Sequence, residues 1–268
     1  MTAFHVMAGP NAEVAHPVVR KISVADVWDA LAKGLDDFRE KPSHYVFLCL
    51  IYPISGVVLM TWSSGANLLP LMFPLMAGFA LLGPFFALGL YEISRRREIG
   101  MDTSWQHALR VRHSPALPAI LTIGFMLVVL FIAWLLVAQG VYTHFFGEEA
   151  PRSLGTFLNQ VLHTEAGWMM MIAGNAIGFC FAVVVLATTV VAFPLLLDRD
   201  VGVVSALDTS LRATFTNPVP IAVWGLIVTA GLVIGTIPIF AGLAVIMPIL
   251  GHATWHLYRK LVVVPLKR

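Results

Sequence analysis

The stretch GPFFALGLYEISRRREIG, residues 83–100, changes from apolar to strongly basic within a few residues. An apolar run rich in Gly and Phe leads to Tyr91 and Glu92, and the consecutive Arg95, Arg96 and Arg97 follow closely. An apolar segment that ends in arginine is typical of a helix that reaches the headgroup region of a bilayer, because basic residues remain on the cytoplasmic side. The stretch therefore predicts a membrane protein.

The composition of the whole chain agrees with this interpretation. The 268 residues are 58% hydrophobic and only 12% charged, and the mean hydropathy is +0.83, whereas soluble domains are about 25% charged. The net charge of +2 is too small to indicate a nucleic-acid partner. Cys49 and Cys180 lie in apolar runs, so we interpret both as small buried side chains. The first 21 residues lack the pattern of a signal peptide, and we expect none to be removed.

The apolar runs have the length of membrane spans, since a spanning helix needs roughly 20 apolar residues. The chain is also uncharged from Val219 to Tyr258. This long run divides at GTIP, 235–238, because Gly and Pro interrupt a helix. The sequence thus predicts an all-α polytopic bundle of six transmembrane helices, at about 44–63, 68–93, 116–140 and 166–197, with two more within 219–258.

The distribution of basic residues predicts the orientation of these spans. Of the 17 lysines and arginines, all but Arg152 lie in the N-terminal segment, the connections 94–115 and 198–217, or the C-terminal segment. Basic loops stay on the cytoplasmic side. We therefore expect a multi-pass protein with both termini in the cytoplasm. In the outer connection, the stretch RSLGTFLNQVLH, 152–163, has apolar residues at helical spacing, which predicts a further helix there.

Parts of the sequence recur at fixed spacing, as expected of an internal repeat. REIG, 97–100, and RDVG, 199–202, are each followed after eight residues by a Leu-Arg pair. We interpret the repeated unit as a cytoplasmic amphipathic helix, a proline and two spans. This interpretation predicts a pseudo-threefold bundle with three interfacial helices. Its units are about 21–93, 97–197 and 199–258, and their prolines are Pro42, Pro115 and Pro218. All three units belong to one membrane domain, 21–260. A flexible tail, 1–20, precedes this domain, and a basic tail, 261–268, follows it.

The first interfacial helix has the clearest pattern. Ser23 and Asp26 form an N-cap pair, and apolar residues then occupy one face, with charged residues on the other. A helix with Trp and Leu on its apolar side is expected to lie in the headgroup plane. The expected apolar face consists of Val24, Val27, Trp28, Leu31, Leu35 and Phe38. The second and third interfacial helices are expected to start at Thr103 and near Val204.

Ionisable residues within the expected spans are nearly absent, and Glu92 is the exception. Arg95 and Arg96 follow it by one helical turn, so an ion pair on the same helix is one interpretation. The other is a polar site formed by Tyr91, Glu92, Arg95, Arg96 and Arg97, which binds a lipid phosphate or an acidic segment of a partner. In mid-span, Asn175 indicates either an interhelical hydrogen bond or a binding site.

His252 and His256 are four residues apart, so they share one helix face at a spacing that permits metal or haem ligation. However, the stretch HATWH lacks the glutamate of zinc hydrolases. We interpret these histidines as polar residues at a headgroup boundary, and they are only weak candidates for metal ligands. No phosphate-binding glycine loop or nucleophile elbow is present in the sequence. We therefore predict no cofactor, no metal site and no enzymatic activity.

The chain resembles an uncharacterised family of predicted bacterial integral membrane proteins, a domain of unknown function with six spans. The resemblance rests on residues 83–100, on LLLDRDVGVVSALDTSLRATFTNPVPIAVWG at 195–225 and on the interfacial helix before the first span. It covers most of residues 20–260. It implies a location in the bacterial inner membrane, and no catalytic residue or cofactor.

Three functional hypotheses follow. The first is a non-enzymatic scaffold, assembly factor or accessory subunit of a membrane complex, whose partners are the lipid bilayer and another membrane protein or a second copy of the chain. The second is a transporter or channel for a small apolar or weakly polar solute, since broken helices line transport sites. The third is a haem- or copper-handling protein associated with a respiratory oxidase, with His252 and His256 as ligands.

Overall fold

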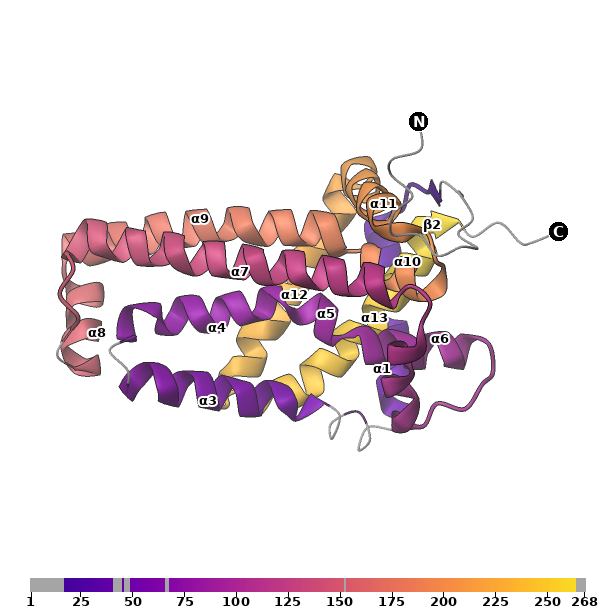
Figure 1. The fold of residues 1–268 in the computed structure, drawn as a ribbon, viewed down its shortest axis with the longest axis horizontal. Coiled ribbons are helices and arrows are strands. Elements are labelled where there is room, and N and C mark those ends of the chain that lie inside the picture. The colour runs from indigo at the N-terminus through magenta and orange to yellow at the C-terminus, as the bar shows by residue number, and fades with distance from the viewer. Residues whose placement is uncertain (1–16, 41–44, 46–48, 66–67, 152, 264–268) are drawn as a thin grey trace. The chain divides into compact units, whose positions relative to one another are not determined.

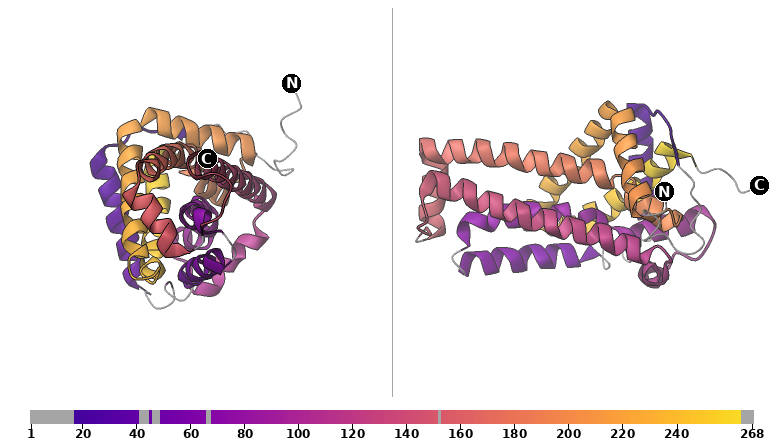
Figure 2. Two further views of the ribbon diagram at one scale, coloured as in Figure 1. Left: turned by 90° about the vertical axis from the view of Figure 1, so that its left-hand side faces the viewer. Right: turned by 45° about the horizontal axis from the view of Figure 1, so that its top comes forward.

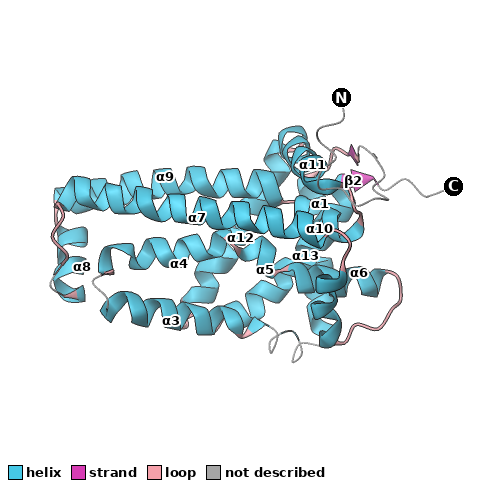
Figure 3. Ribbon diagram, viewed as in Figure 1, coloured by secondary structure: helices cyan, strands magenta, loops and turns pink. Residues whose placement is uncertain are grey.

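The computed structural model of the protein describes residues 17–40, 45, 49–65, 68–151 and 153–263 (Figure 1). Helices account for nearly all regular structure in these ranges (Figure 3), which confirms the all-α class. The described strands are β1 (Val18–Val19) and β2 (Val262–Val263). The chain forms two compact units. The predictions of one membrane domain and of its division into repeat units stay predictions. Unit 1 comprises 1–53, 84–124 and 186–268, and unit 2 comprises 54–83 and 125–185.

Unit 1 is built around three helices, α1 (Val24–Glu40), α6 (Leu88–Glu98) and α13 (Leu243–Leu261). The predicted N-cap of α1 is confirmed, because the Ser23 backbone N–H donates to Asp26 Oδ2 at 2.9 Å and the Ser23 hydroxyl donates to the same oxygen at 2.8 Å. Unit 1 also contains η2 (Trp105–His113), α10 (Ala192–Asp198), α11 (Gly202–Thr216) and α12 (Pro218–Thr236).

The face of α1 that packs within the protein is not the apolar face that is predicted to lie in the headgroup plane. It consists of Val27, Ala30, Gly34 and Asp37, while Trp28 is 54% exposed and Leu31, Leu35 and Phe38 are only partly buried. The reason is steric. A Cβ atom on Gly34 would lie 2.5 Å from the backbone nitrogen of Ala253 in α13. Small side chains allow the two backbones this close approach, so α1 packs on α13 through its small residues.

The other two predicted interfacial helices differ from each other. The second, η2, is a 3₁₀ helix that begins after Ser104 rather than at Thr103, whereas α11 is an α-helix. A 3₁₀ helix rises about 2.0 Å per residue, so it bridges a longer distance with the same number of residues. The glycines that align the repeat behave alike, since Gly100 and Gly202 have φ angles of +71° and +77°. The superposition of whole repeat units stays a prediction.

A small sheet joins the two ends of the described chain. Strand β1 pairs antiparallel with β2, with Val18 opposite Val263 and Val19 opposite Val262. The sequence predicts tails at 1–20 and 261–268 and no strand in either, because two-residue strands are too short to show an alternating pattern. Several predictions fall on residues outside the described ranges. They concern the helix-ending Pro42, the tail residues 1–16 and 264–268, Arg152 and part of the expected span 44–63.

Unit 2 contains most of α3 (Ile51–Gly65), α7 (Leu117–Phe146) and α9 (Glu165–Thr189), together with η1 (Leu69–Leu71), α4 (Met72–Leu81) and α8 (Leu154–His163). The Trp134 indole N–H donates to the carbonyl of Pro74 at 2.8 Å, and its ring lies 5.7 Å from that of Phe181. Helix α8 confirms the helix predicted at 152–163, and Phe157 and Val161 pack it against Leu69 and Tyr142.

Within the described part of the chain, three helical stretches are long and apolar enough to cross a membrane. They are Leu117–Phe146, Glu165–Asp198 and Pro218–Thr236, and Figure 2 shows α7 and α9 from two further directions. The expected span 68–93 is instead divided into η1, α4, the short α5 (Gly83–Phe86) and α6, in a segment that carries three prolines. Cys49 is buried, but Cys180 is exposed on α9, so the prediction of a buried side chain is wrong there. A residue on an apolar helix can face lipid instead.

Candidate functional site

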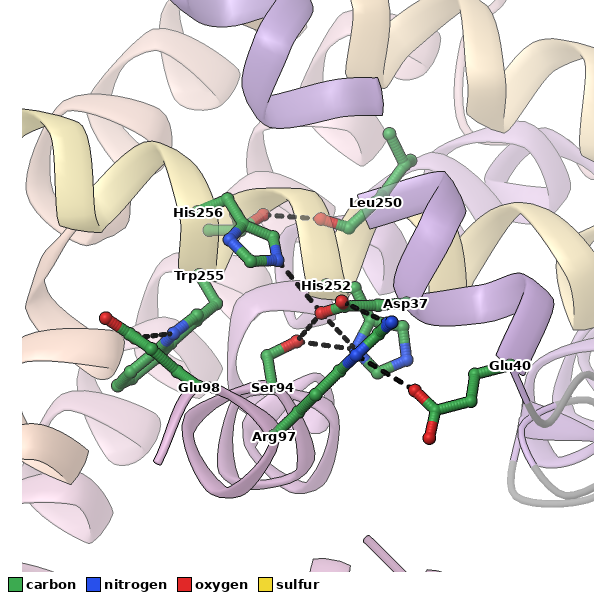
Figure 4. A network of polar contacts seen from close by, with 10 residues as sticks. Asp37, Glu40, Ser94, Arg97, Glu98, Leu250, His252, Trp255 and His256 are labelled. Carbon is green, nitrogen blue, oxygen red and sulfur yellow. Dashed lines mark hydrogen bonds and ion pairs between the residues drawn. The ribbon is translucent and has the colours of Figure 1, made fainter. Parts of the chain in front are cut away.

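A polar cluster in unit 1 is centred on Asp37, whose side chain is 7% exposed (Figure 4). Its Oδ1 accepts a hydrogen bond from the Arg97 guanidinium at 2.6 Å. Its Oδ2 accepts from the Ser94 hydroxyl at 2.7 Å and contacts His256 Nε2 at 2.9 Å. These partners come from α6 and α13, so a single carboxylate on α1 joins all three helices.

The contacts of Ser94 determine the tautomer of His252. Ser94 Oγ lies 2.7 Å from His252 Nδ1, and its only proton is donated to the Asp37 carboxylate. His252 must therefore donate from Nδ1, which leaves Nε2 without a proton in the neutral ring. The ring is fully buried and packs edge-on against Tyr45 at 4.7 Å. His252 Nε2 has no hydrogen-bond partner among the described residues.

The environment of Asp37 keeps its carboxyl group ionised at neutral pH. Burial by itself raises the pKa of Asp37, but the hydrogen bonds from His256 and Ser94 outweigh it. The pKa of Asp37 therefore lies below its ordinary value. An ionised Asp37 has no proton to donate, which supports the assignment of the donors around it.

A pocket of about 330 Å³ opens beside this cluster, and its lining is almost entirely charged or polar. Arg97, which faces the pocket, also pairs with Glu40 at 2.9 Å. Glu98 accepts hydrogen bonds from the Trp255 indole at 3.0 Å and from Arg259 at 2.9 Å. Most charges around the pocket are thus already paired within the protein. Its lining residues are Lys33, Asp36, Asp37, Ser94, Arg97, Glu98 and His256.

The predicted site at the arginine triplet divides into two groups. Glu92 pairs with Arg95 and with Arg96, each at 2.8 Å, and Glu92 and Arg96 are buried. This confirms the ion-pair interpretation. Arg97 points away to Asp37 and Glu40, and Tyr91 is buried. In the described structure each of the three arginines therefore has a carboxylate partner. A lipid or partner site at these residues stays an untested prediction.

The other candidates from the sequence are also engaged within the protein. His252 and His256 converge on Asp37 from α13, as their spacing on one helix face allows. In the described ranges no group of three or more His, Cys, Asp or Glu side chains is arranged to hold a metal ion. Asn175 donates to the carbonyl of Met171 in its own helix at 2.8 Å, rather than to a neighbouring helix.

Asp37 and Ser94 are not among the site residues that the sequence predicts. One signal was available, since Asp37 continues the series Val27, Ala30 and Gly34 at helical spacing. A carboxylate at the end of a small, apolar helix face needs a partner when that face is buried. The identity of the partners required the fold, because Ser94 and His256 are 57 and 219 residues away in the sequence.

The order of the contacts limits what this cluster does chemically. In a hydrolytic triad, the histidine lies between the serine and the acid and takes the serine proton. Here Ser94 lies between Asp37 and His252, and its hydroxyl proton is held by the carboxylate. The arrangement therefore does not activate Ser94 as a nucleophile. It is a buried hydrogen-bond network that connects three helices.

Together, the apolar helices and the internally paired polar residues define a polytopic, helical integral membrane protein. Residues 72–198 match a protein family described as "Predicted integral membrane protein (DUF2189)", which confirms the resemblance to an uncharacterised membrane family. The matched region runs from the start of α4 to the end of α10. Comparison with curated proteins and with solved structures finds no match to the chain.

Proposed function

We propose that the protein is a non-enzymatic multispan protein of the bacterial inner membrane, which serves as a scaffold, assembly factor or accessory subunit of a membrane complex. The observation that carries this proposal is the Asp37 network. Both carboxylate oxygens are occupied by protein donors, and the Ser94 proton is committed to one of them. The network thus supplies rigidity rather than a reactive group.

The rigidity has a physical basis. A buried carboxylate is costly unless it is paired and hydrogen-bonded, and satisfied polar networks favour one arrangement of the elements they connect. Asp37 fixes α1 against α6 and α13, and Trp28 on α1 stays 54% exposed. A firmly held helix with an exposed tryptophan suits contact with a membrane-protein partner or with a second copy of the chain.

For the membrane topology we propose six spans, both termini in the cytoplasm and three interfacial helices. Three helical stretches of spanning length support this topology, as does the concentration of basic residues in alternate connections. The remaining spans are assigned to α3, to the broken segment 69–98 and to α13. The short helix α3 and the broken segment 69–98 can span the bilayer where neighbouring helices satisfy the freed backbone groups.

The topology predicts the behaviour of reporters fused after residue 150. A phosphatase, which is active only outside the cytoplasm, is expected to be active there and inactive when fused after residue 105. A reporter that fluoresces only in the cytoplasm is expected to give the reverse pattern. Cytoplasmic fluorescence after residue 150 would exclude the proposed orientation.

The scaffold role predicts a stoichiometric partner when the tagged full-length chain is purified from bacterial membranes in mild detergent. Trp28→Ala is expected to reduce the bound partner about tenfold, because exposed aromatic anchors carry much of the energy of an interface. The matched control is Trp168→Ala, a tryptophan 56% exposed on α9, which is expected to retain the partner.

The opposite results would contradict the scaffold role. A chain that purifies without partner or second copy, and that releases a small solute from liposomes, would be a transporter. Equal retention of the partner by Trp28→Ala and the wild type would show that α1 is not the interface.

One observation favours the haem- or copper-handling alternative. His252 Nε2 carries a free lone pair in a fully buried ring, as an axial or metal ligand requires. The visible absorption spectrum and the metal content of the purified protein test this alternative. On the scaffold proposal we expect no haem band and less than about 0.1 copper per chain. A haem band that disappears in His252→Ala but persists in His107→Ala would establish the alternative.

A further inference from the structure

A second pocket in unit 1, of about 380 Å³, lies on η2. Basic side chains dominate its lining, with the exposed Leu109 beside them (54% exposed). Arg110 and Arg112 are both exposed, and His107 is held by Asp102 at 3.0 Å. The full lining is Gln106, His107, Leu109, Arg110, Arg112 and His113.

These two arginines differ from the three arginines on α6. Arg95 and Arg96 are paired with Glu92, and Arg97 with Asp37 and Glu40. In contrast, the side chains of Arg110 and Arg112 form neither an ion pair nor a hydrogen bond with the described residues. The carboxylate of Asp102 pairs with His107 instead. Two guanidinium groups that line one pocket without a counter-charge among the described residues repel each other, so the site favours an anion.

The position of η2 along the chain indicates where that anion comes from. Helix α7, one of the helices of spanning length, begins at Leu117, five residues after Arg112. Its outward-facing apolar surface includes Leu121, 52% exposed. A segment this close to the start of a span lies at the membrane surface, at the depth of the headgroups. Leu109, which is also exposed, adds an apolar side chain to the lining of the pocket itself.

We propose that the η2 pocket binds the phosphate of an anionic phospholipid, with Arg110 and Arg112 as the ligating residues. Guanidinium groups bind phosphate oxygens through paired, charge-assisted hydrogen bonds, and Leu109 provides contact for the first carbons of the lipid. Basic pockets beside spans bind headgroups in this way. The proposal depends on neither the scaffold role nor the orientation, and it concerns residues other than the arginine triplet.

The test uses the full-length protein in detergent micelles, to which phosphatidylglycerol is added and bound lipid is counted by native mass spectrometry. Arg110→Gln with Arg112→Gln is expected to weaken binding at least tenfold. The matched control is Arg39→Gln with Arg212→Gln, which removes two charges from exposed ion-paired arginines; it is expected to change binding less than twofold. All four side chains lie on the surface, so both double variants are expected to fold, and circular dichroism checks this.

Two further titrations distinguish the lipid from other sources of phosphate. Phosphatidylcholine, which has no net charge, is expected to bind at least tenfold more weakly than phosphatidylglycerol. Inorganic phosphate at the same concentration is expected not to displace the bound lipid. The proposal is overturned if phosphatidylcholine or inorganic phosphate binds as well as phosphatidylglycerol, if the Arg110/Arg112 variant retains wild-type binding, or if the control variant loses as much.

Discussion

Replacing Asp37 by Asn is expected to lower the free energy of unfolding of the full-length protein by about 3 kcal/mol. The carboxylate accepts hydrogen bonds from Ser94, Arg97 and His256. An asparagine amide places an N–H₂ group against one set of these donors, and it removes the negative charge that faces Arg97. The measurement is urea unfolding of the purified chain in micelles, followed by tryptophan fluorescence.

The neighbouring Asp36 provides the matched control. Its side chain is 66% exposed and reaches Arg39 only at 3.6 Å, so Asp36→Asn is expected to change stability by less than about 0.5 kcal/mol. Equal stability of the two variants would show that Asp37 does not hold the three helices together.

The same carboxylate gives the stability a pH dependence with a definite sign. Burial raises the pKa of Asp37, but the hydrogen bonds from His256 and Ser94 outweigh it, so the folded-state pKa lies below the ordinary 3.8. A group of this kind contributes its full stability above the ordinary pKa. We expect the difference between wild type and Asp37→Asn to shrink as the pH falls below about 4.

The second large effect is expected from Gly34→Ala at the contact of α1 with α13. The added Cβ would lie within 2.5 to 2.7 Å of the backbone and Cβ of Ala253, and backbone atoms do not yield as a flexible side chain does. We expect a loss of about 3 kcal/mol, at the upper end of the cost of overpacking, measured by the same unfolding experiment.

Gly140→Ala in α7 is the control for this change. Gly140 is also helical, but a Cβ there meets no atom within 4 Å. Because alanine is the better helix former, this variant is expected to be neutral or more stable by up to about 1 kcal/mol. If Gly34→Ala behaves like Gly140→Ala, α1 does not pack on α13 as described.

Much of the local structure was predictable from the sequence. The cap at Ser23 and Asp26, the helix at Leu154–His163 and the pairing of Glu92 with Arg95 and Arg96 all depend on residues within one or two turns. Such interactions are encoded by spacing alone. The family resemblance was also predictable, because it rests on contiguous stretches.

The buried face of α1 and the candidate site were less predictable. The apolar pattern placed Trp28 and Leu31 on the face expected in the headgroup plane, but it did not indicate the side that packs on α13, where the close approach of Ala253 selects Gly34 and Ala30. Likewise, the triplet Arg95, Arg96 and Arg97 looks uniform in the sequence. Only the fold separates Arg97, which reaches Asp37, from the two arginines that remain with Glu92.

The sequence by itself determined that this is an all-helical membrane protein, because hydrophobic length and the positions of Lys and Arg act locally through the solvation of each segment. The tertiary structure alone decided which polar residues are satisfied. Asp37, Ser94 and His252 come from three helices far apart in the chain, and hydrogen bonds act only over about 3 Å. Their meeting depends on how the helices pack, which no spacing along the sequence records.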